Sequence, residues 1–370
     1  MLQVKSVFGT GVAALAVAVM LAAGSAAAAS GWTVVSVPSA GQAAILSGVS
    51  ADSDSDAWAV GFTTSSSEGL SYHWAGTSWR QVAVPKNGSL LHTRLYAVST
   101  ASTKDAWAVG KSWSQSQYPH AAAYHWDGKA WTPIPASTQW LLGVTDIGPG
   151  NAYAVGTQLE HWDGTTWTRL AFPDPGAVTL TAISADAAND IWVAGDYNDP
   201  NICASQCSGP EQPFSLHWDG TGWQGVPMPQ NTDSSVLYHL GSVDAISPSD
   251  VWTVGYTKTP DGLDAFGNVA YAYSNLIEHW DGTSWSVVSA PLGAGLTGVT
   301  SSSPSNIWAV GGSTVLFWDG TSWTTVSGAD PVSSSALSAV STRPGAALTW
   351  AVGSAFDSTT GNSPFVLEHN

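Results

Sequence analysis

A seven-residue stretch that combines a histidine, an aspartate and two tryptophans recurs along the chain. It reads HWDGTSW at 279–285 and returns with small changes at 73, 125, 161, 217 and 317. Histidine and aspartate bind metals and exchange protons, and tryptophan stacks on ligands, so the motif has the residue types of a binding site. It also has the residue types of a turn and packing module. The elements that carry the motif decide between the two.

The motif belongs to a longer repeat of four short alternating segments. One unit reads LTGVTSSSPSNIWAVGGSTVLFWDGTSWTTVS at 296–327. Asp-Gly between its third and fourth segments is a strong hairpin signal. Four antiparallel strands in a unit of about 45 residues are typical of a propeller blade. The cognate units begin at Leu46, Leu95, Leu141, Leu180, Leu240 and Leu337.

The number of repeats indicates seven blades and a closure between distant parts of the chain. Fourth segments that follow a third segment number only six, whereas GWTVVSVP at 31–38 matches SWTTVSG at 322–328. We therefore predict an all-β, seven-bladed propeller over residues 30–370, in which the strand near Trp32 pairs with the strand that ends at Asn370. Second-segment aromatics occur seven times: Trp58, Trp107, Tyr153, Trp192, Trp252, Trp308 and Trp350.

The repeated polar residues are expected to serve the scaffold. One position per blade holds a histidine, so a ring would keep these side chains apart, and Phe317 occupies the same place in blade six. Asp-Gly aspartates are hairpin residues. ADSDSD at 51–56 resembles a calcium loop, but it is in register with TASTKD at 100–105 and SPSNI at 303–307, which indicates a turn. The histidines assigned to this position are His73, His125, His161, His217, His279 and His369.

The first 29 residues have the pattern of a secretory signal peptide. Lys5 precedes an apolar run at 7–23, and small residues follow at 26–29. The net charge is −17, and removal of Lys5 makes it one unit more negative, which disfavours binding to nucleic acid or anionic membranes. We expect a secreted, extracellular monomer, in which Cys203 and Cys207 form a local disulfide.

Catalytic constellations are not recognisable in the sequence. Arginines after the leader are few and scattered, which disfavours a sialidase-type cluster, and nucleophile-elbow, zinc-protease and phosphate-loop motifs do not occur. We therefore expect no catalytic residues, no cofactor and no metal site. If the protein were an enzyme, the acidic residues expected in loops on one face would be candidates: Glu68, Asp196, Asp199, Glu211, Asp261 and Asp264.

Residues that depart from the repeat are the candidates for binding. Trp113 and Trp140 lie outside the repeat, and the topology places them on one face with Tyr118. Arg94, Trp140 and His239 directly precede first segments and are expected to rim the central opening of that face. Exposed aromatics there suit a protein or sugar ligand, and they equally suit a small core within the loops. The variable insertions between second and third segments are 62–71, 111–123, 196–215 and 256–276.

The blades resemble those of two known groups of propellers. The DGTSW turns resemble Asp-box (BNR) hairpins, with a spacing one residue shorter. The chain after the leader resembles the secreted seven-bladed propellers typified by dispase autolysis-inducing protein, in its leader, its WAVG and HWDG segments and its split last blade. That resemblance implies a non-enzymatic protein that binds extracellular neutral metalloproteases, promotes their autolysis, and is a transglutaminase substrate.

The alternatives to this function remain open at the level of sequence. A lectin that binds cell-wall polysaccharide could use the same aromatic residues, and a propeller glycosidase or lyase is the third possibility. By analogy with the resembled family, the candidate cross-linking glutamines are Gln42, Gln115, Gln117 and Gln139.

Overall fold

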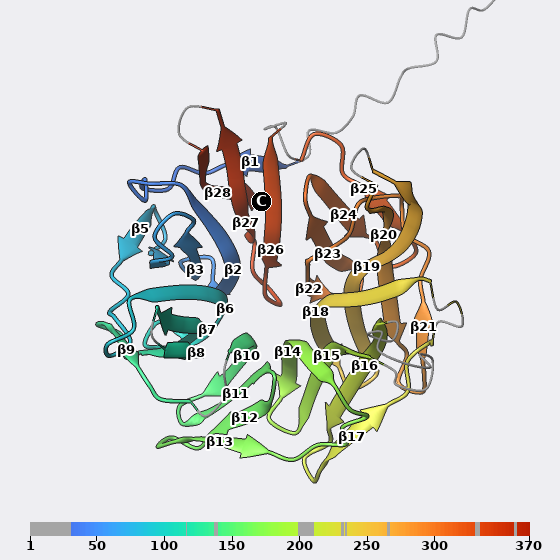
Figure 1. The fold of residues 1–370 in the computed structure, drawn as a ribbon, viewed down its shortest axis with the longest axis horizontal. Helices are drawn as coiled ribbons and strands as arrows, with labels where there is room; N and C mark the ends of the chain where they lie inside the picture. Colours follow the sequence, from blue (N-terminus) through green and yellow to red (C-terminus); the bar gives the residue numbers. More distant parts are fainter. Residues whose placement is uncertain are drawn as a thin grey trace, which may run out of the picture.

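The protein forms seven four-stranded antiparallel sheets arranged as blades around a central axis (Figure 1). The described chain contains strands and no helix, which confirms the predicted all-β, seven-bladed propeller. None of the described residues forms a helix that is long and apolar enough to cross a membrane. The computed structural model describes residues 31–115, 117–136, 140–198, 211–230, 233, 235–264, 267–329, 334–358 and 361–370.

Each blade runs from an innermost strand at the axis to an outermost strand at the rim. The innermost strands are β2 (Ala44–Ser53), β6 (His92–Ser102), β10 (Leu141–Gly148), β14 (Val178–Ala187), β18 (Leu237–Ser247), β22 (Gly298–Ser303) and β26 (Ser335–Ser341). The second strands are β3 (Asp56–Thr63), β7 (Asp105–Ser114), β11 (Asn151–Gly156), β15 (Asp190–Asn198), β19 (Asp250–Leu263), β23 (Asn306–Gly311) and β27 (Thr349–Asp357).

The outer half of each blade carries the HWDG hairpin. The third strands are β4 (Gly69–Trp74), β8 (Gln117–Trp126), β12 (Leu159–Trp162), β16 (Glu211–Trp218), β20 (Val269–Trp280), β24 (Thr314–Trp318) and β28 (Gly361–His369). The outermost strands are β5 (Trp79–Val82), β9 (Trp131–Pro133), β13 (Trp167–Leu170), β17 (Trp223–Val226), β21 (Trp285–Val287), β25 (Trp323–Thr325) and, in blade seven, β1 (Trp32–Val34).

The ring closes between the two ends of the described chain. β1 pairs antiparallel with β28, with Trp32 opposite His369 and Val34 opposite Leu367. Blade seven therefore takes its outermost strand from the N-terminal segment, as the repeat count predicts. Leu367 is fully buried and Trp32 is nearly so, and both belong to the core between blades six and seven.

Aromatic side chains form the contacts between neighbouring blades. The second-strand tryptophan of one blade meets the third- and fourth-strand tryptophans of the next blade, as Trp58 meets Trp126 and Trp131 at centroid distances of 4.7 and 4.8 Å. Edge-to-face pairs of this kind add about 0.5–1.5 kcal/mol to the burial of their area. The repeated tryptophans are therefore scaffold, in line with the sequence analysis.

The assignment of His369 to the repeated histidine position is wrong. Glu368 lies opposite Trp350, where the other blades place the histidine, and His369 is one residue farther along. Its ring lies 4.6 Å from Trp308 and 5.2 Å from Trp32, which is the position of a third-strand tryptophan. The letters EH match those of EHW in blade five, but the buried residues Phe365 and Leu367 fix a register one residue away.

Hydroxyl groups link the innermost strands around the axis. Ser50 accepts a hydrogen bond from the Thr100 backbone of the next blade at 3.1 Å, and Ser99 accepts one from Asp146 at 2.9 Å. In blade five the corresponding residue is Asp244, whose carboxylate takes a 2.5 Å hydrogen bond from the hydroxyl of Ser301. This half-buried acid therefore has a structural role that serine has in blades one and two.

Candidate functional site

The repeated histidines pair with residues of the scaffold. His73 lies 2.6 Å from Asp56 and stacks on Trp58 at a centroid distance of 4.3 Å, and the same arrangement recurs in blades two, four and five. In blade three the partner is Asn151, at 2.9 Å. Within the described part of the chain, no group of three or more histidine, cysteine or acidic side chains could hold a metal ion. These pairs join second to third strands rather than forming a site.

The acidic run at 51–56 is also distributed among scaffold contacts. Asp52 forms an ion pair with Arg343, Asp54 accepts hydrogen bonds from the backbone of Ala347 and Leu348, and Asp56 binds His73. The three carboxylates thus serve different partners. This arrangement agrees with the turn that the sequence register indicates.

A narrow cavity of about 200 Å³ follows the axis of the ring. It is lined by the innermost strands of all seven blades, mostly by small residues, and Tyr96 is the largest side chain on its wall. Arg94, Trp140 and His239, which were expected to rim the opening, do not line this cavity. Arg94 and His239 are the third residues of β6 and β18 rather than residues that precede these strands, and Trp140 directly precedes β10.

Two cations and three aromatic rings gather beside the axial opening, and we call this group the Arg94 cluster: Arg94, Lys111, Phe62, Tyr96 and Trp113. The Arg94 guanidinium lies 4.6 Å from the centre of the Phe62 ring and 5.5 Å from that of Trp113. The Lys111 ammonium lies 5.5 Å from the Trp113 ring and 5.9 Å from the Tyr96 ring. Because all five side chains are half-buried, the cations are held in place while remaining in contact with solvent.

A strained turn in blade one holds the arginine. Ser67, buried between β3 and β4, has a φ of 52°, and its hydroxyl accepts hydrogen bonds from Nε and Nη2 of Arg94 at 3.2 and 3.1 Å. Left-handed conformations are uncommon for serine, and such strain is often found at ligand sites. Neither Arg94 nor Lys111 forms an ion pair with a carboxylate among the described residues.

A second group lies on blades four and five, and we call it the His239 cluster: His239, Asp196, Glu211 and Tyr256. Nδ1 of His239 lies 2.7 Å from Oδ2 of Asp196, whose other oxygen accepts a hydrogen bond from the Leu240 backbone at 2.9 Å. The Asp196 side chain is only 8% exposed, whereas that of His239 is 34% exposed. The Tyr256 ring lies 4.9 Å from the imidazole.

The two carboxylates change the ionisation of this cluster. Burial lowers the pKa of His239, but the hydrogen bond to Asp196 and the negative charges of Asp196 and Glu211 outweigh it, so the pKa is raised overall. Burial, together with the charge of Asp196, raises the pKa of Glu211. The imidazole therefore stays positive to a higher pH than a free histidine does.

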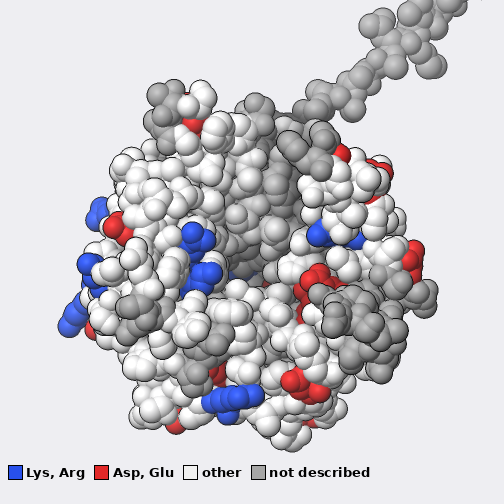
Figure 2. Space-filling view, in the orientation of Figure 1, with Lys and Arg blue, Asp and Glu red and all other residues white. Residues whose placement is uncertain are grey.

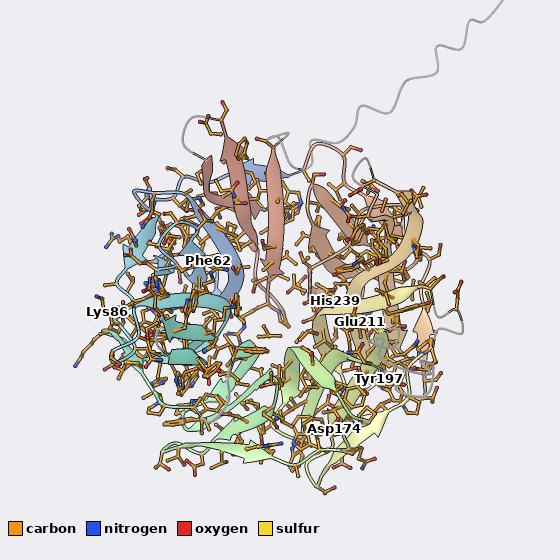
Figure 3. All side chains as sticks on the ribbon, viewed as in Figure 1. Phe62, Lys86, Asp174, Tyr197, Glu211 and His239 are labelled. Carbon is orange, nitrogen blue, oxygen red and sulfur yellow. The ribbon has the colours of Figure 1, made fainter. Side chains whose placement is uncertain are left out.

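The Arg94 and His239 clusters face each other across the axial opening. Figure 2 shows basic atoms on one lip of the central hollow, and acidic atoms together with a further basic group on the lip across from it. In Figure 3, Phe62 of the Arg94 cluster and Glu211 and His239 of the other cluster lie on opposite sides of the opening. We call this face, on which second and third strands are joined, the insertion face. A ligand that spans the opening would meet opposite charges on its two sides.

The remaining sequence candidates are dispersed. Tyr118, on β8, is 87% exposed, and Trp140 is half-buried. Within the described residues, neither ring contacts Trp113, whose neighbouring ring is that of His92 at 5.3 Å. Trp113 thus belongs with the cations of its own blade and with Phe62 of blade one, rather than with the other two sequence-selected aromatics.

The candidate glutamines differ in their surroundings. The Gln42 amide donates to Ser66 at 2.9 Å and accepts from Ser65 at 2.5 Å, and it also lies 3.4 Å from Glu68. Gln115 is exposed at the turn that follows β7. Gln117 begins β8, and its side chain is not described. Three predicted features lie outside the described residues: Gln139, Asp199 and the Cys203–Cys207 disulfide.

Two of the expected insertion loops are continuations of strands. Residues 111–123 belong mostly to β7 and β8, and 256–276 form the long ends of β19 and β20 around a tip that carries Asp261 and Asp264. The alternation in VAYAYS at 269–274 was the sequence signal for this extension.

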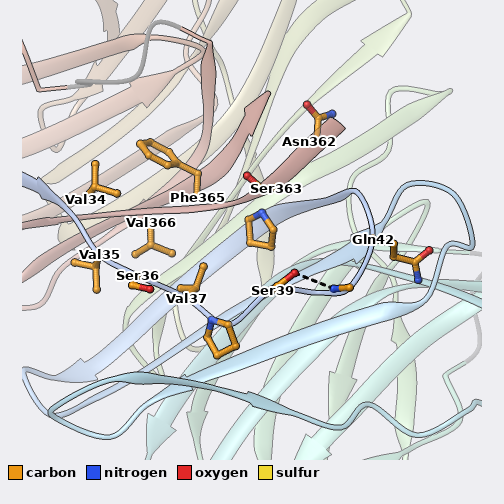
Figure 4. Close-up of a pocket in the computed structure, with 13 residues that line it drawn as sticks. Val34, Val35, Ser36, Val37, Ser39, Gln42, Asn362, Ser363, Phe365 and Val366 are labelled. Carbon is orange, nitrogen blue, oxygen red and sulfur yellow. Dashed lines mark hydrogen bonds between the residues drawn. The ribbon is translucent and has the colours of Figure 1, made fainter. Parts of the chain in front are cut away.

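A groove lies beside the ring closure. It has a volume of about 680 Å³ and runs between Val34–Gln42 and Asn362–Val366, where the chain leaves β1 and crosses to blade one (Figure 4). Its lining is apolar with a few amides and hydroxyls. The described groove contains neither a titratable side chain nor a cation, so its chemistry is that of packing rather than of catalysis.

The comparisons with known proteins establish the fold and leave the function open. No protein-family model matches the chain, and neither does any protein with a curated description. Among solved structures, YCF48 from Cyanidioschyzon merolae is similar at a TM-score of 0.54 and 16% identity, over 92% of this chain and 98% of that one. The fold is that of a β-propeller.

Binding propellers and enzymes both occur among the similar structures. The WD40 repeats of RRP9 match at a TM-score of 0.58 and 9% identity, covering 91% of this chain and 97% of that one. A polysaccharide lyase of family PL25, an ulvan lyase, matches at 0.55 and 10%, covering 89% and 95%. At these identities the likeness concerns the fold alone, and propellers host many unrelated activities.

Proposed function

We propose that this protein is a secreted, non-enzymatic binding propeller that takes another extracellular protein as its ligand on the insertion face. The observation that carries the proposal is the Arg94 cluster. Its two cations have no carboxylate partner among the described residues, although the chain as a whole has a net charge of −17. Because Arg343 is the only lysine or arginine with an ion pair among the described residues, what distinguishes these two cations is the aromatic rings that hold them beside the opening.

The geometry of Arg94 suits a carboxylate. Ser67 and the Phe62 and Trp113 rings fix the guanidinium, so that little side-chain freedom remains to be lost on binding. Its remaining N–H groups can bind a carboxylate in the two-pronged manner that only arginine offers. Arginine and tryptophan are also the residues that most often dominate the energy of protein interfaces.

The resemblance to secreted protease-modulating propellers supports a partner class. We infer an extracellular neutral metalloprotease, whose autolysis the bound propeller promotes, and a transglutaminase that uses the propeller as its glutamine donor. Gln115 is the described candidate best suited to cross-linking, because it is exposed at a turn, whereas hydrogen bonds hold the amide of Gln42. Acyl transfer to an enzyme requires an accessible carboxamide.

The test measures how long a thermolysin-like protease survives in the presence of the propeller. Wild-type protein is expected to shorten the lifetime of the protease, and Arg94→Ala is expected to weaken this effect about tenfold or more, which corresponds to about 1.4 kcal/mol. Arg80→Ala is the matched control, because Arg80 is exposed on the outermost strand β5, away from the insertion face.

The possible outcomes test the metalloprotease as partner and the Arg94 cluster as contact separately. An unchanged protease lifetime with wild-type protein contradicts the metalloprotease as partner. Equal potency of Arg94→Ala and wild type, after thermal melts show both to be folded, contradicts the Arg94 cluster as the contact.

A second candidate function rests on the His239 cluster. An imidazole that is fixed by a buried carboxylate, beside a second carboxylate and a phenol, has the parts of an acid–base catalyst. Propeller lyases and arabinofuranosidases share the fold, so a polysaccharide is the substrate class to test. Turnover of any uronate polysaccharide or arabinan that disappears in His239→Ala would establish this function over the first.

A further inference from the structure

One hairpin extends well beyond its blade. β18 pairs with β19 only as far as Lys258, but β19 and β20 continue to pair with each other to Leu263 and Val269. Residues 259–263 and 269–274 are exposed, with the exception of half-buried Ala270. Two-stranded ribbons gain little stability on their own, so an extension of this kind usually meets a partner.

Large apolar side chains collect on this ribbon. Of the ten large apolar residues that are strongly exposed in the described chain, four lie here: Leu263, Val269, Tyr271 and Tyr273, at 69, 49, 38 and 44% exposure. Clusters of this kind, as distinct from single exposed residues, mark interaction sites. The other six are scattered over the molecule, and of these Val287 on β21 also belongs to blade five.

The ribbon tyrosines form one continuous line with the His239 cluster, and we call it the tyrosine strip: His239, Tyr256, Lys258, Tyr273 and Tyr271. In the antiparallel register, His239 is opposite Tyr256, Lys258 is opposite Tyr273, and Pro260 is opposite Tyr271, so these side chains share one face. The Tyr256 and Tyr273 rings lie 5.4 Å apart, and the Lys258 ammonium lies 4.1 Å from the Tyr271 ring.

The outer edge of the ribbon has no strand beside it among the described residues. β21 pairs with β20 only from Glu278 to Trp280, and the following connection reaches back as far as Asn275, whose amide donates to Pro291 at 2.9 Å. From Val269 to Ser274, β20 therefore presents main-chain donors and acceptors on that side. Such an edge readily pairs with an extended segment of another chain.

The shape of the strip favours a peptide over a sugar chain. The planes of the His239 and Tyr256 rings differ by 37°, and those of Tyr256 and Tyr273 by 63°, so the rings do not form a flat platform for stacked pyranose rings. Alternate residues of a strand lie about 6.8 Å apart, which matches the spacing of alternate side chains in a second strand. Tyrosines on such a surface supply rigid contact area.

The charges at the base of the strip favour a basic segment. Asp196 and Glu211 place two carboxylates near His239 and Lys258, and Asp261 and Asp264 at the ribbon tip make this end of the blade acidic overall. The net charge of −17 also attracts cationic partners from a distance. A lysine or arginine of the ligand would find its counter-charge at Glu211.

We propose that the β19–β20 ribbon docks an extended, basic segment of the partner protein, which adds as a strand along Val269–Ser274. Its alternate apolar side chains pack on Tyr271 and Tyr273, and a basic residue lies toward Glu211. This inference rests on the proposed function in that it takes the ligand to be a protein, and it adds a second contact that is independent of the Arg94 cluster.

The test selects displayed random peptides on the intact wild-type protein and screens the bound peptides against the Tyr271→Ser/Tyr273→Ser double variant. Peptides with alternating apolar residues and a basic end are expected, with binding about tenfold weaker to the double variant. A synthetic copy with N-methyl groups on the amides that face the ribbon is expected to lose a similar factor, because strand addition requires those donors.

Two further proteins complete the design. Tyr271→Phe/Tyr273→Phe keeps the rings and is expected to retain peptide binding, which guards against a folding defect of the serine variant. Arg94→Ala is expected to bind the peptides as wild type does. The peptide result can therefore be interpreted even if the protease assay contradicts the role of the Arg94 cluster. Selection of no tyrosine-dependent peptide, or equal binding of the N-methylated copy, overturns the proposal. A glycan-array signal that depends on the two tyrosines also overturns it.

Discussion

A single glycine in the WAVG segment of each blade is required by the backbone that faces it. A Cβ atom built on Gly110 would lie 1.9 Å from the carbonyl oxygen of Arg94, and one on Gly255 would lie 1.8 Å from that of His239. A register shift next to these carbonyls, between Leu95 and Ala97 and between Leu240 and Ser242, turns them toward the second strand. Because the glycine allows this close approach of the two strands, it helps to set the position of Arg94 and His239 on the insertion face.

Substitution of this glycine tests the close approach. Gly110→Ala is expected to lower the free energy of unfolding by about 3 kcal/mol, because a backbone carbonyl rather than a flexible side chain occupies the space. Gly222→Ala is the control, with nothing within 4 Å and no left-handed φ, and it should stay within about 0.5 kcal/mol of wild type. Denaturant unfolding of both proteins gives the comparison, and equal stabilities would contradict the argument.

The third strand of every blade has one buried position at which the residue differs from blade to blade. Leu216, Leu316 and Tyr72 fill it in blades four, six and one, whereas blades three and five have the buried acids Glu160 and Glu278. Neither carboxylate oxygen of Glu278 is hydrogen-bonded within the described structure. Burial raises the pKa of Glu278 to about 8. The carboxyl group of Glu278 is therefore protonated over most of the physiological range.

Glu278 is expected to make the stability of the ring depend on pH. Its pKa in the folded state lies above the ordinary value, so the folded state binds the proton more tightly and the free energy of unfolding falls as pH rises from about 4.5 to about 8. Glu278→Leu should remove this slope and stabilise the protein at pH 8 by on the order of 3 kcal/mol, with little gain at pH 5. Urea unfolding at the two pH values would reveal an equal gain at both if the carboxyl were ionised throughout.

The blades could be predicted from the sequence, whereas the register of the last strand and the Arg94 cluster could not. The alternating segments, with Asp-Gly turns in five of the blades, predicted all seven blades, because hairpins are local and each repeat confirms the others. His369 was misplaced because the matching letters EH counted for more than the burial of Phe365 and Leu367, which sets the register. The Arg94 cluster joins residues from β3, β6 and β7 of two blades, so only the packing of blades brings Phe62 and Ser67 to Arg94.

At the scale of the whole molecule, the ring depends on a single short closure. Trp32 contacts Trp308 at a centroid distance of 5.2 Å and fills, with His369, the place that two tryptophans hold elsewhere. If β1 were absent, β28 would expose the edge that carries Leu367–His369. Open edges in a seven-sheet ring invite pairing between molecules.

Removal of residues 30–38 tests the closure. The shortened protein is expected to melt at a temperature lower by about 10 °C or more and to aggregate, because it loses a buried tryptophan and a paired strand. Trp32→Ala separates the two losses, since it keeps the strand and should cost about 3–5 kcal/mol. Retention of the wild-type melting temperature in the shortened protein would show that the ring closes without β1.

The β1–β28 pairing also sets an order of events during folding. Loop closure over nearly the whole chain carries the largest entropy cost of any strand pairing in the protein, so it comes late. Trp32 stays without its partner strand on the ribosome until Leu367–His369 have emerged, and six blades can assemble before the seventh. The ring is therefore completed late, and the time spent with an open blade is the period in which this protein is most exposed to proteases and to its own copies.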